Sequence, residues 1–350
     1  MPGNSFGTFF RITTWGESHG KGLGVVIDGC PPNIFLDEPT IQAMLDRRRP
    51  GQSPASTCRR ESDQGVILSG VFENRTTGTP IMIMLANQDA DSSAYAPHAD
   101  LYRPGHADFT YQAKFGIRDW RGGGRSSARE TAGRVAGGAV AKCLLEQEGI
   151  KVCAYTIQLG EIKTDERDLS AINENPFLCP DPVAAKKMLS LVEQTKKEGD
   201  SLGGVVEMLI KNAPTGLGDP VFDKLDADLA KAMMSIGAVK GVEIGAGFNA
   251  AAMPGSEHND PITPHGFSTN HAGGILGGIS NGEDIVVRVA IKPIPSIGKI
   301  QQTIDISGNP QSISVTGRHD VSAIPRINVV CEAMAYLTLS DHLLRQRAIS

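Results

Sequence analysis

Short apolar runs, separated by glycine, proline and polar residues, recur along the whole chain. Each is rich in valine, isoleucine or leucine and has about the length of an ordinary strand. The predicted strands are Gly22–Asp28, Gly65–Phe72, Pro80–Ala86, Lys151–Leu159, Gly203–Ile210, Gly241–Ala246 and Asp284–Ile291. Helical segments alternate with them, so the pattern predicts a fold that mixes helices and strands.

Longer segments with apolar residues at helical spacing predict the helices. These are Glu38–Arg48, Gly105–Phe115, Ser127–Glu148, Pro182–Lys197, Phe222–Ile236 and Ile327–Arg347. Ser127–Glu148 has several interior glycines, each of which costs a helix about 1 kcal/mol relative to alanine. We therefore expect another backbone to pack closely against this helix, at the centre of the fold. Ile327–Arg347 has a more amphipathic pattern and a basic end, which suits a helix C-terminus.

The order of these patterns repeats in the two halves of the chain. A Gly-Val-Val strand, followed by proline and then a helix, begins at Gly24 and again at Gly204. A glycine–arginine pair precedes each of the two long helices, at Gly124 and at Gly317. The hypothesis is an internal duplication with pseudo-twofold symmetry. The alternative is a chance similarity between short glycine patterns.

On this hypothesis the chain is a single domain made of two pseudo-repeats, at about residues 1–150 and 200–350. Each would run strand–helix–strand–strand–helix, with residues 249–281 inserted into the second. Helices and sheets must bury their apolar faces against one another. We therefore expect the two long helices to form a layer between two sheets.

The distribution of charge indicates a small anionic ligand. The 350 residues carry a net charge of -5 and only 5% are aromatic, which argues against a nucleic-acid surface. Residues 1–134 hold 13 of the 19 arginines but 2 of the 15 lysines. Guanidinium groups bind carboxylate and phosphate in a bidentate way. The first part of the chain therefore favours a site that binds a small polyanion. Surface ion pairs, the alternative, would use lysine as freely as arginine.

The cysteine and histidine patterns predict neither a disulfide framework nor a metal site. The cysteines are Cys30, Cys58, Cys143, Cys153, Cys179 and Cys331, without a CxxC pair. They have the pattern of reduced thiols in a cytosolic protein. The eight histidines form no HExxH motif. There is no leader-like segment and no apolar run of the roughly 18 residues that a membrane span needs, so we expect a soluble, cytoplasmic protein.

The segment Gly122–Ala141 carries the clearest sign of a binding site. A glycine run leads into Arg125, Ser126 and Ser127. Ser127 and Glu130 have the S-x-x-E spacing of a capping box, which predicts the start of a helix. Glycines, hydroxyls and arginines at a helix N-terminus together favour an anion. The alternative is an ordinary capped helix.

Two histidines lie in glycine-rich turns. His19 is flanked by Ser18 within Gly16–Gly20, and His106 lies three residues after Arg103. A lone histidine is more often structural than catalytic. Here the neighbouring glycines let the backbone approach a ligand closely, which favours a functional role.

Four further segments have patterns that suit ligand binding. Asp46–Arg49 ends a helix with three cations, more than the helix dipole requires. Lys292–Ser296 places a cation and a hydroxyl on a proline-stiffened turn, and Gly317–Asp320 sets a carboxylate beside two cations. The glycine-dense Asn270–Ser280 suits a loop against a flat ligand. It is not a phosphate loop, and no GxSxG or Rossmann pattern occurs, which disfavours a hydrolase elbow or dinucleotide fold.

Together these segments resemble the chorismate synthase family. The matching motifs, in order, are GESHGKGLGVVIDGCPP, DRRRPG, RPGHAD, GGGRSSARET, NHAGGILGGIS, KPIPS and GRHD, and the resemblance spans residues 7 to about 347. It implies an α+β fold, a β-α-β sandwich with long central helices between antiparallel sheets, and usually a homotetramer. It also implies a lyase of the shikimate pathway, which converts 5-enolpyruvylshikimate 3-phosphate to chorismate by 1,4-anti elimination of phosphate. The family requires reduced FMN without net redox change.

The resemblance further implies roles for individual residues. Substrate ligands would be Arg48, Arg49, Arg103, Arg129 and Arg134. The catalytic residues would be His106 at the departing phosphate, His19 as the proton donor to reduced flavin, Asp320 at the carbon 6 proton, and Ser18 and Ser127 in support. FMN would contact Arg125, Ser126, Ser127, Gly237, Ala238, Gly277, Lys292, Pro293, Ile294, Pro295, Ser296 and Arg318. Histidine suits these roles because its pKa lies near neutrality.

One position departs from the family pattern. Relatives often have an arginine where this chain has Pro54, a position attributed, with Arg48, to NADPH binding. We therefore expect NADPH to act only indirectly, through an external source of reduced flavin, because the motifs leave no length for a reductase domain. Two alternatives stay open. One is a flavin-dependent oxidoreductase acting on a small anionic substrate, and the other is a non-catalytic module that binds phosphorylated metabolites or RNA.

Overall fold

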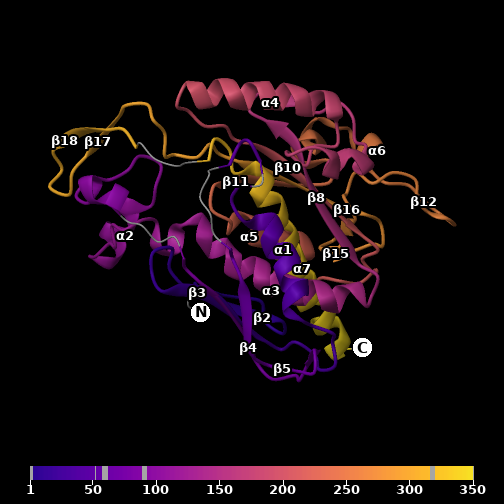
Figure 1. Cartoon of the computed structure of the whole chain (residues 1–350). Coiled ribbons are helices and arrows are strands. Elements are labelled where there is room, and N and C mark those ends of the chain that lie inside the picture. The colour runs from indigo at the N-terminus through magenta and orange to yellow at the C-terminus, as the bar shows by residue number, and fades with distance from the viewer. Residues whose placement is uncertain (1–2, 52, 57–61, 89–92, 316–319, 350) are drawn as a thin grey trace.

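Two antiparallel sheets enclose a layer of helices (Figure 1). The structure, a computed structural model, describes residues 3–51, 53–56, 62–88, 93–315 and 320–349. The first sheet has the order β1 (Ser5–Phe6), β2 (Arg11–Gly16), β3 (Gly22–Asp28), β7 (Ile81–Ala86), β4 (Gly65–Ser69). The second has the order β11 (Val239–Ile244), β16 (Ile285–Ile291), β10 (Gly204–Lys211), β8 (Lys151–Leu159), β9 (Ile162–Lys163). Every neighbouring pair in both sheets is antiparallel.

The helix layer consists of α1 (Glu38–Arg48), α3 (Thr131–Glu146), α5 (Leu225–Met234) and α7 (Ile324–Ile349). α3 packs against β2, β3 and β7 of the first sheet, whereas α7 packs against β8 and β10 of the second. The two long helices also contact each other extensively. A Cβ atom added at Gly138 of α3 would lie 2.5 Å from the Ala333 Cβ of α7. The interior glycines therefore allow close helix packing, as the sequence predicted.

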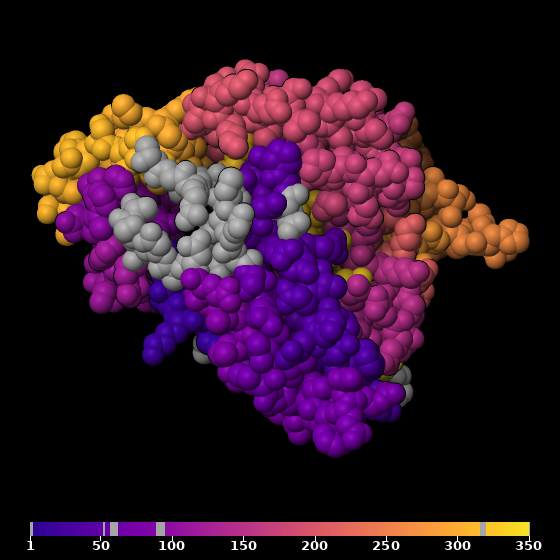
Figure 2. Space-filling model, in the orientation of Figure 1, coloured from indigo at the N-terminus to yellow at the C-terminus, as the bar shows by residue number. Residues whose placement is uncertain are grey.

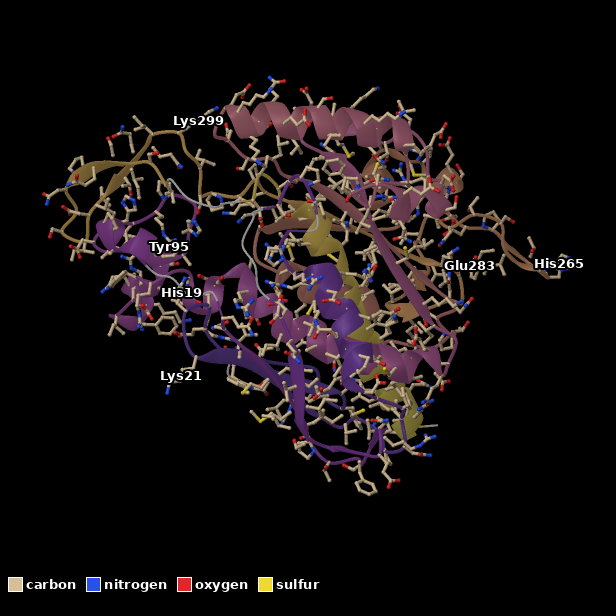
Figure 3. The ribbon with its side chains drawn as sticks, viewed as in Figure 1. His19, Lys21, Tyr95, His265, Glu283 and Lys299 are labelled. Atoms are coloured by element: carbon tan, nitrogen blue, oxygen red, sulfur yellow. The ribbon has the colours of Figure 1, made fainter. Side chains whose placement is uncertain are left out.

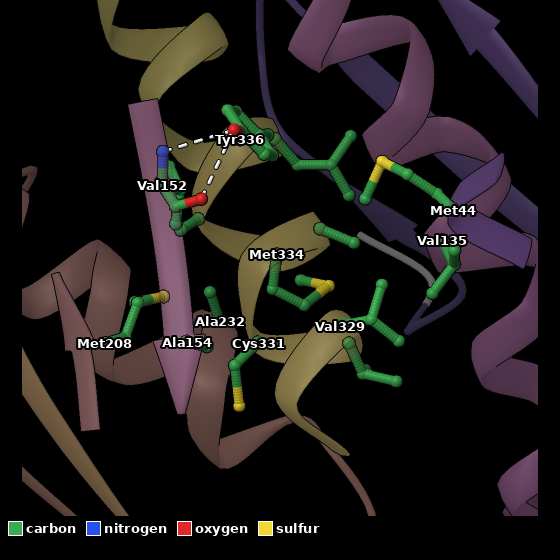
Figure 4. Close-up of a cluster of buried hydrophobic side chains, with 14 of the residues drawn as sticks. Met44, Val135, Val152, Ala154, Met208, Ala232, Val329, Cys331, Met334 and Tyr336 are labelled. Carbon is green, nitrogen blue, oxygen red and sulfur yellow. Dashed lines mark hydrogen bonds between the residues drawn. The ribbon is translucent and has the colours of Figure 1, made fainter. Parts of the chain in front are cut away.

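α7 is buried on all sides from Ile324 to Leu343, apart from Arg326, which is half-buried. The prediction of an amphipathic helix was therefore wrong for most of its length. The physical reason is its position, because α1, α3, α5 and the second sheet surround it. Several of its polar side chains bond to neighbouring elements inside the core, and Figure 4 shows Tyr336 bonded to the backbone of Val152.

The strongest local patterns gave the helix and strand bounds accurately. β3, α1, β8 and α4 (Pro182–Lys197) have the predicted limits. The predicted strand Gly65–Phe72 is interrupted at Gly70, whose φ of +80° turns the chain into a hairpin of β5 (Val71–Phe72) and β6 (Arg75–Thr76). The sequence analysis missed β2, in which two adjacent threonines hide the apolar pattern.

The remaining elements are short and lie around the sandwich. They are α2 (Asp108–Phe115), α6 (Gly255–His258), the hairpins β12 (Ile262–Thr263)–β13 (Gly266–Phe267), β14 (Ile275–Leu276)–β15 (Ile279–Ser280) and β17 (Gln301–Ile304)–β18 (Pro310–Ile313), and the 3-10 turns Ser93–His98, Gly124–Ser126, Ala128–Glu130, Leu169–Glu174 and Gly247–Ala252. α2 and β17–β18 lie together on one side of the molecule, and β12–β13 projects on the opposite side (Figure 2). None of the described helices combines the length and hydropathy needed to cross a membrane.

The two sheets share one strand order. In the first, β2–β3–β7–β4 are neighbours, and in the second β8–β10–β16–β11 occupy the corresponding places along the chain. α1 and α5 follow the corresponding strands β3 and β10, and α3 and α7 follow β7 and β16. This correspondence supports the duplication, which stays a prediction until the two halves are superposed.

Candidate active site

Two predicted substrate arginines meet on one buried carboxylate, that of Asp63. Arg48, the last residue of α1, donates from Nη1 to Asp63 Oδ2 over 2.9 Å. Arg129, in the 3-10 turn before α3, donates from Nη1 to Asp63 Oδ1 over 2.5 Å. Burial disfavours the charged carboxylate, but the charges and hydrogen bonds of the two arginines outweigh it and lower the pKa of Asp63. The carboxyl is therefore ionised, and the three side chains form a buried unit with a net charge of +1.

Arg129 also links this unit to the turn that carries His19. Its Nε donates to Asn87 Oδ1 over 2.5 Å, and Asn87 Nδ2 donates to the carbonyls of Glu17 and Gly20, each over 2.9 Å. These bonds fix both ends of the Glu17–Gly20 turn. Within it, the Ser18 hydroxyl lies 3.0 Å from His19 Nδ1. The pairing of Ser18 with His19 agrees with the supporting role predicted for this serine.

His19 and Arg103 both contact one aromatic ring, that of Tyr95. The His19 ring meets the Tyr95 ring edge-on, with centroids 5.3 Å apart, and both side chains are labelled in Figure 3. The Arg103 guanidinium lies 5.4 Å from the centroid of the same ring. Arg103 Nη2 also donates to the carbonyl of Gly122 over 3.2 Å. His19, Arg103 and the start of the glycine run are therefore brought together, as the site prediction requires.

His106 faces the turn that contains Lys292–Ser296. His106 Nε2 lies 2.8 Å from Ser296 Oγ, and Lys292 Nζ donates to the carbonyl of Gly105 over 2.7 Å. The His106 backbone N–H donates to the Arg103 carbonyl, which joins this pair to the cluster around Tyr95. The RPGHAD and KPIPS segments are thus neighbours in space, although they are 187 residues apart.

Asp320 is placed beside the end of α1 by Arg326 of α7. Arg326 Nη1 donates to Asp320 Oδ2 over 2.7 Å, and Arg326 Nε donates to the Arg48 carbonyl over 3.0 Å. Asp320 therefore belongs to the same network as Arg48. Predicted Arg318, from the same motif, lies outside the described residues.

The predicted capping box is wrong. α3 begins at Thr131, and the 3-10 turns Gly124–Ser126 and Ala128–Glu130 precede it. Ser127 Oγ accepts from the Arg129 N–H over 3.3 Å, so it caps the second turn and not α3. The Glu130 carboxylate does not return to Ser127, because it accepts instead from Thr14 and Arg134.

Arg125 and Ser126 lie in the 3-10 turn Gly124–Ser126, close to the first sheet. Arg125 Nη2 donates to Thr14 Oγ1 over 2.6 Å, and its Nη1 donates to the Gly16 carbonyl over 3.1 Å. Ser126 Oγ donates to the Gly123 carbonyl over 2.6 Å. Arg125 thus lies next to the strand that leads into the His19 turn, which places two of the predicted FMN ligands beside the catalytic candidates.

Two predicted substrate arginines point elsewhere. Arg134 donates to Glu130 Oε2 over 2.8 Å and to Ser235 Oγ over 2.6 Å, so its guanidinium lies at the C-terminal end of α5. The Arg49 side chain is 41% exposed and its guanidinium lies 3.4 Å from Asp46. The structure does not bring either one to Asp63 or Tyr95.

The predicted flavin contacts fall into two groups. Gly237 and Ala238 follow α5, and the Ala238 carbonyl accepts from the Lys292 N–H over 2.9 Å, which places them beside the KPIPS segment. Gly277 lies at the other end of α5, where the Gly278 carbonyl accepts from the N–H of Leu225. A ten-residue helix is about 15 Å long. Within one chain Gly277 is therefore separated from the other group.

The group beside Lys292 has the chemistry that a phosphorylated flavin needs. The Lys292 ammonium donates to the Gly105 carbonyl and pairs with no carboxylate of the described residues. Burial and, after it, repulsion from Lys240 lower the pKa of Lys292. A Cβ atom at Gly237 would meet no other atom within 4 Å, so the backbone there is open to a ligand. Pro293 and Pro295 stiffen the turn, and Ser296 adds a hydroxyl. An ammonium that pairs with no carboxylate of the described residues, a hydroxyl and open backbone fit an anionic, flat cofactor.

The sequence analysis missed five residues of this site. They are Asp63, Asn87, Tyr95, Asp108 and Arg118. Asp108 stands inside the RPGHAD motif, so its place beside Arg103 could have been suspected. No local pattern marks Asp63, Asn87 or Tyr95, because Arg129 and His19, which they contact, come from distant parts of the chain. Arg118 lies only ten residues after its partner Asp108, but no motif marks it.

A separate cavity lies away from these residues. It has a volume of about 380 Å³, and its lining includes Arg47, Cys153, Glu332 and Tyr336. Its charged and hydroxyl groups are already paired, Glu332 with Arg47 and Tyr336 with the backbone of Val152. No cluster of three or more histidine, cysteine or acidic side chains that could hold a metal occurs among the described residues.

Comparisons with known proteins identify the family of the chain. The family model described as chorismate synthase matches residues 10–344. A protein named chorismate synthase from Desulfosudis oleivorans is 66% identical over 351 residues, covering 100% of this chain and 99% of that protein. Another of that name, from Desulfatibacillum aliphaticivorans, is 62% identical and covers 100% of this chain and 98% of its own. A solved structure described as "Crystal Structure of Chorismate Synthase" is 34% identical, with a TM-score of 0.78, covering 97% of this chain and 93% of its own, and it confirms the predicted fold class.

Proposed function

The chain belongs to the chorismate synthase family, a family of lyases, and on this basis we propose that it converts 5-enolpyruvylshikimate 3-phosphate to chorismate. The reaction is a 1,4-anti elimination of phosphate that depends on reduced FMN and has no net redox change. The observation that carries the proposal is the convergence of buried Arg48, Arg103 and Arg129 around His19 and His106.

The arginines suit a substrate with two carboxylates and a phosphate. Each guanidinium has five N–H donors. Hydrogen bonds to protein atoms use Nε and Nη2 of Arg103, and no described residue accepts from its Nη1. Buried cations with fixed geometry bind anionic groups with little reorganisation, and they stabilise the phosphate as it leaves. Two negative molecules can then lie side by side without prohibitive repulsion.

Lys292, Ser296, Arg125 and the open backbone at Gly237 would hold FMN. When bound, reduced FMN supplies the electron density that lets the allylic phosphate depart. The protein contributes placement and the charge of the buried arginines Arg48, Arg103 and Arg129.

The remaining residues manage protons. His106, held by Ser296, would donate to the oxygen of the departing phosphate as the carbon–oxygen bond breaks. Asp320, oriented by Arg326, would receive the proton lost from carbon 6. His19, supported by Ser18, would hold a proton beside the reduced cofactor. The atoms balance, because one proton and one phosphate leave the substrate.

Anaerobic incubation with reduced FMN and the enolpyruvyl substrate tests the proposal. We expect phosphate release together with chorismate absorbance, abolished by His106→Ala and strongly reduced by Arg48→Ala. His265→Ala serves as the control, because His265 is exposed at the tip of the β12–β13 hairpin (Figure 3). Consumption of NADPH in proportion to product would instead support a flavin-dependent oxidoreductase. Normal turnover by both site variants would refute the assignment of the site.

The proposal also covers the oligomeric state of the protein and its source of reduced flavin. We infer a homotetramer in the cytoplasm that takes reduced flavin from an external source. Pro54, in place of an arginine, supports an indirect role for NADPH. Molecular mass in solution tests the tetramer, and titration of the flavin-free protein with NADPH tests whether it binds directly.

A further inference from the structure

Asp63 is a buried charge at the centre of the candidate site. Its side chain is 0% exposed, and its two carboxylate oxygens accept from two different arginines, Arg48 and Arg129. The arginines come from separate elements, α1 and the turn before α3. One carboxylate therefore fixes the distance between the two guanidinium groups.

Hydrogen bonds connect the two arginines around Asp63 to the turn of His19 and to Asp320, the groups proposed to handle protons. On one side Arg129 holds Asn87, which holds the turn of His19. On the other side the carbonyl of Arg48 accepts from Arg326, which holds Asp320. A displacement of either arginine would therefore move a group that the proposed reaction uses.

The carboxylate also sets the charge of the pair. Two buried guanidinium groups without a counter-charge would repel each other and attract any available anion. With Asp63 between them, the unit carries a single net positive charge. Arg48 is held further by the Ala128 carbonyl over 2.6 Å and by Thr131 Oγ1 over 3.2 Å, so the pair has little freedom to adjust.

We propose that Asp63 is a positioning residue, which sets the spacing of the Arg48–Arg129 pair and cancels one of its two positive charges. The effect on turnover rests on the proposed function, whereas the effect on anion binding does not. Removal of the negative charge would strengthen the binding of a simple anion, because the pair would gain one net positive charge. Turnover would fall at the same time, since a misplacement of about 1 Å costs a reaction about 100-fold.

Glu207 offers a matched control in the second sheet. It is also a buried carboxylate, with a side chain that is 7% exposed, and it also bridges two arginines, Arg167 and Arg288. It lies on β10, and its side chain bonds to Tyr155, Arg167 and Arg288, which lie outside the candidate site. Glu207→Gln therefore makes the same change, from carboxylate to amide, at another buried carboxylate that bridges two arginines outside the candidate site.

The experiment compares wild type, Asp63→Asn and Glu207→Gln in two assays. Calorimetry on the flavin-free protein measures the Kd of inorganic phosphate, and steady-state kinetics with reduced FMN measure kcat and KM. For Asp63→Asn we expect the phosphate Kd to fall about tenfold. A tenfold change in affinity corresponds to an interaction that would shift a pKa by about one unit. We expect its kcat to fall about 100-fold without a rise in KM. Glu207→Gln should stay within about twofold of wild type in both assays.

The proposal is overturned if Asp63→Asn leaves phosphate affinity and kcat unchanged, weakens phosphate binding, or is matched by Glu207→Gln. Should Asp63→Asn fail to fold, Asp63→Glu keeps the charge and changes only the spacing. It should retain wild-type phosphate affinity and lose at least about tenfold in kcat, and a wild-type kcat would overturn the role in spacing. If the wild-type protein shows no turnover but the phosphate results hold, the proposed function fails and the role of Asp63 in setting the charge stands.

Discussion

Arg103 and Asp108 form a bidentate ion pair within one turn of chain, with both side chains buried. Arg103 donates from Nε to Asp108 Oδ2 over 2.8 Å and from Nη2 to Oδ1 over 2.9 Å. The Arg103 backbone N–H also donates to Oδ2, and Arg118 lies 3.0 Å from the same oxygen. The carboxylate therefore fixes the plane of the Arg103 guanidinium over Tyr95.

Asp108→Asn should weaken turnover through Arg103. The amide removes the charge and places an N–H donor against an arginine, so the guanidinium loses its bidentate partner. We expect kcat/KM to fall about 10- to 100-fold, measured with reduced FMN and the enolpyruvyl substrate. Asp28→Asn is the control, because Asp28 pairs with Arg11 at 3.7 Å and both side chains are about half exposed. Equal losses in the two variants would contradict a specific role for Asp108.

Gly122→Ala should displace His19. A Cβ atom at Gly122 would lie 2.4 Å from His19 Nδ1 and 3.2 Å from Ser18 Oγ, and the φ of Gly122 is +122°. No side chain fits there without moving the histidine. We expect a loss of turnover of at least about tenfold, with reduced stability from the strained backbone.

Gly149→Ala separates the effect of backbone strain from the effect of the contact with His19. Gly149 has a φ of +75°, but a Cβ atom there would meet nothing within 4 Å. This variant should lose about 1 kcal/mol of stability and keep its activity. If Gly122→Ala also kept full activity, the contact with His19 would have no bearing on turnover.

The sequence predicted helices and strands best where local signals are strong. α1 and α4 have the predicted bounds because Asp37 and Asp181 cap their first turns and proline follows each cap. The resemblance supplied most residues of the candidate site. It could not supply Asp63, whose partners are 15 and 66 positions away, because no local pattern links them. The burial of α7 was missed for the same reason, since it depends on neighbours that are distant in sequence.

The pH dependence of stability should reflect the carboxylates that hold arginines. Arg48 and Arg129 outweigh burial to lower the pKa of Asp63, and Arg103 outweighs burial to lower that of Asp108. An unfolded aspartate has a pKa of about 3.9. Because the folded pKa values lie below it, their stabilisation is fully present above about pH 4 and is lost as the pH falls through the folded values.

Thermal unfolding between about pH 2 and 7 checks this expectation. The midpoint for wild type should fall as the pH drops below about 4, and Asp108→Asn should show a smaller fall, because the group that titrates is gone. An unchanged slope in this variant would mean that other carboxyl groups control the acid transition.

The contact between α3 and α7 can be tested at two adjacent glycines. At Gly138 a Cβ atom would lie 2.5 Å from the Ala333 Cβ and 2.6 Å from its Cα, so one of the long helices must move. At Gly137 the nearest atoms would be Ile12 Cγ2 at 3.4 Å and Val25 Cγ2 at 3.5 Å, which are ordinary contacts. Alanine gains up to about 1 kcal/mol of helix propensity at either position. For Gly137→Ala we therefore expect the free energy of unfolding to rise by up to about 1 kcal/mol.

For Gly138→Ala, overpacking should outweigh the gain in propensity, with a net loss of about 1–3 kcal/mol in the free energy of unfolding. Urea denaturation of both variants measures the difference, and unchanged m-values would show that the unfolded states are comparable. Because the turn that carries Arg129 leads directly into α3, a shifted α3 should also lower turnover in Gly138→Ala. If both variants proved equally stable, the close approach of the two helices at Ala333 would not limit the packing of the core.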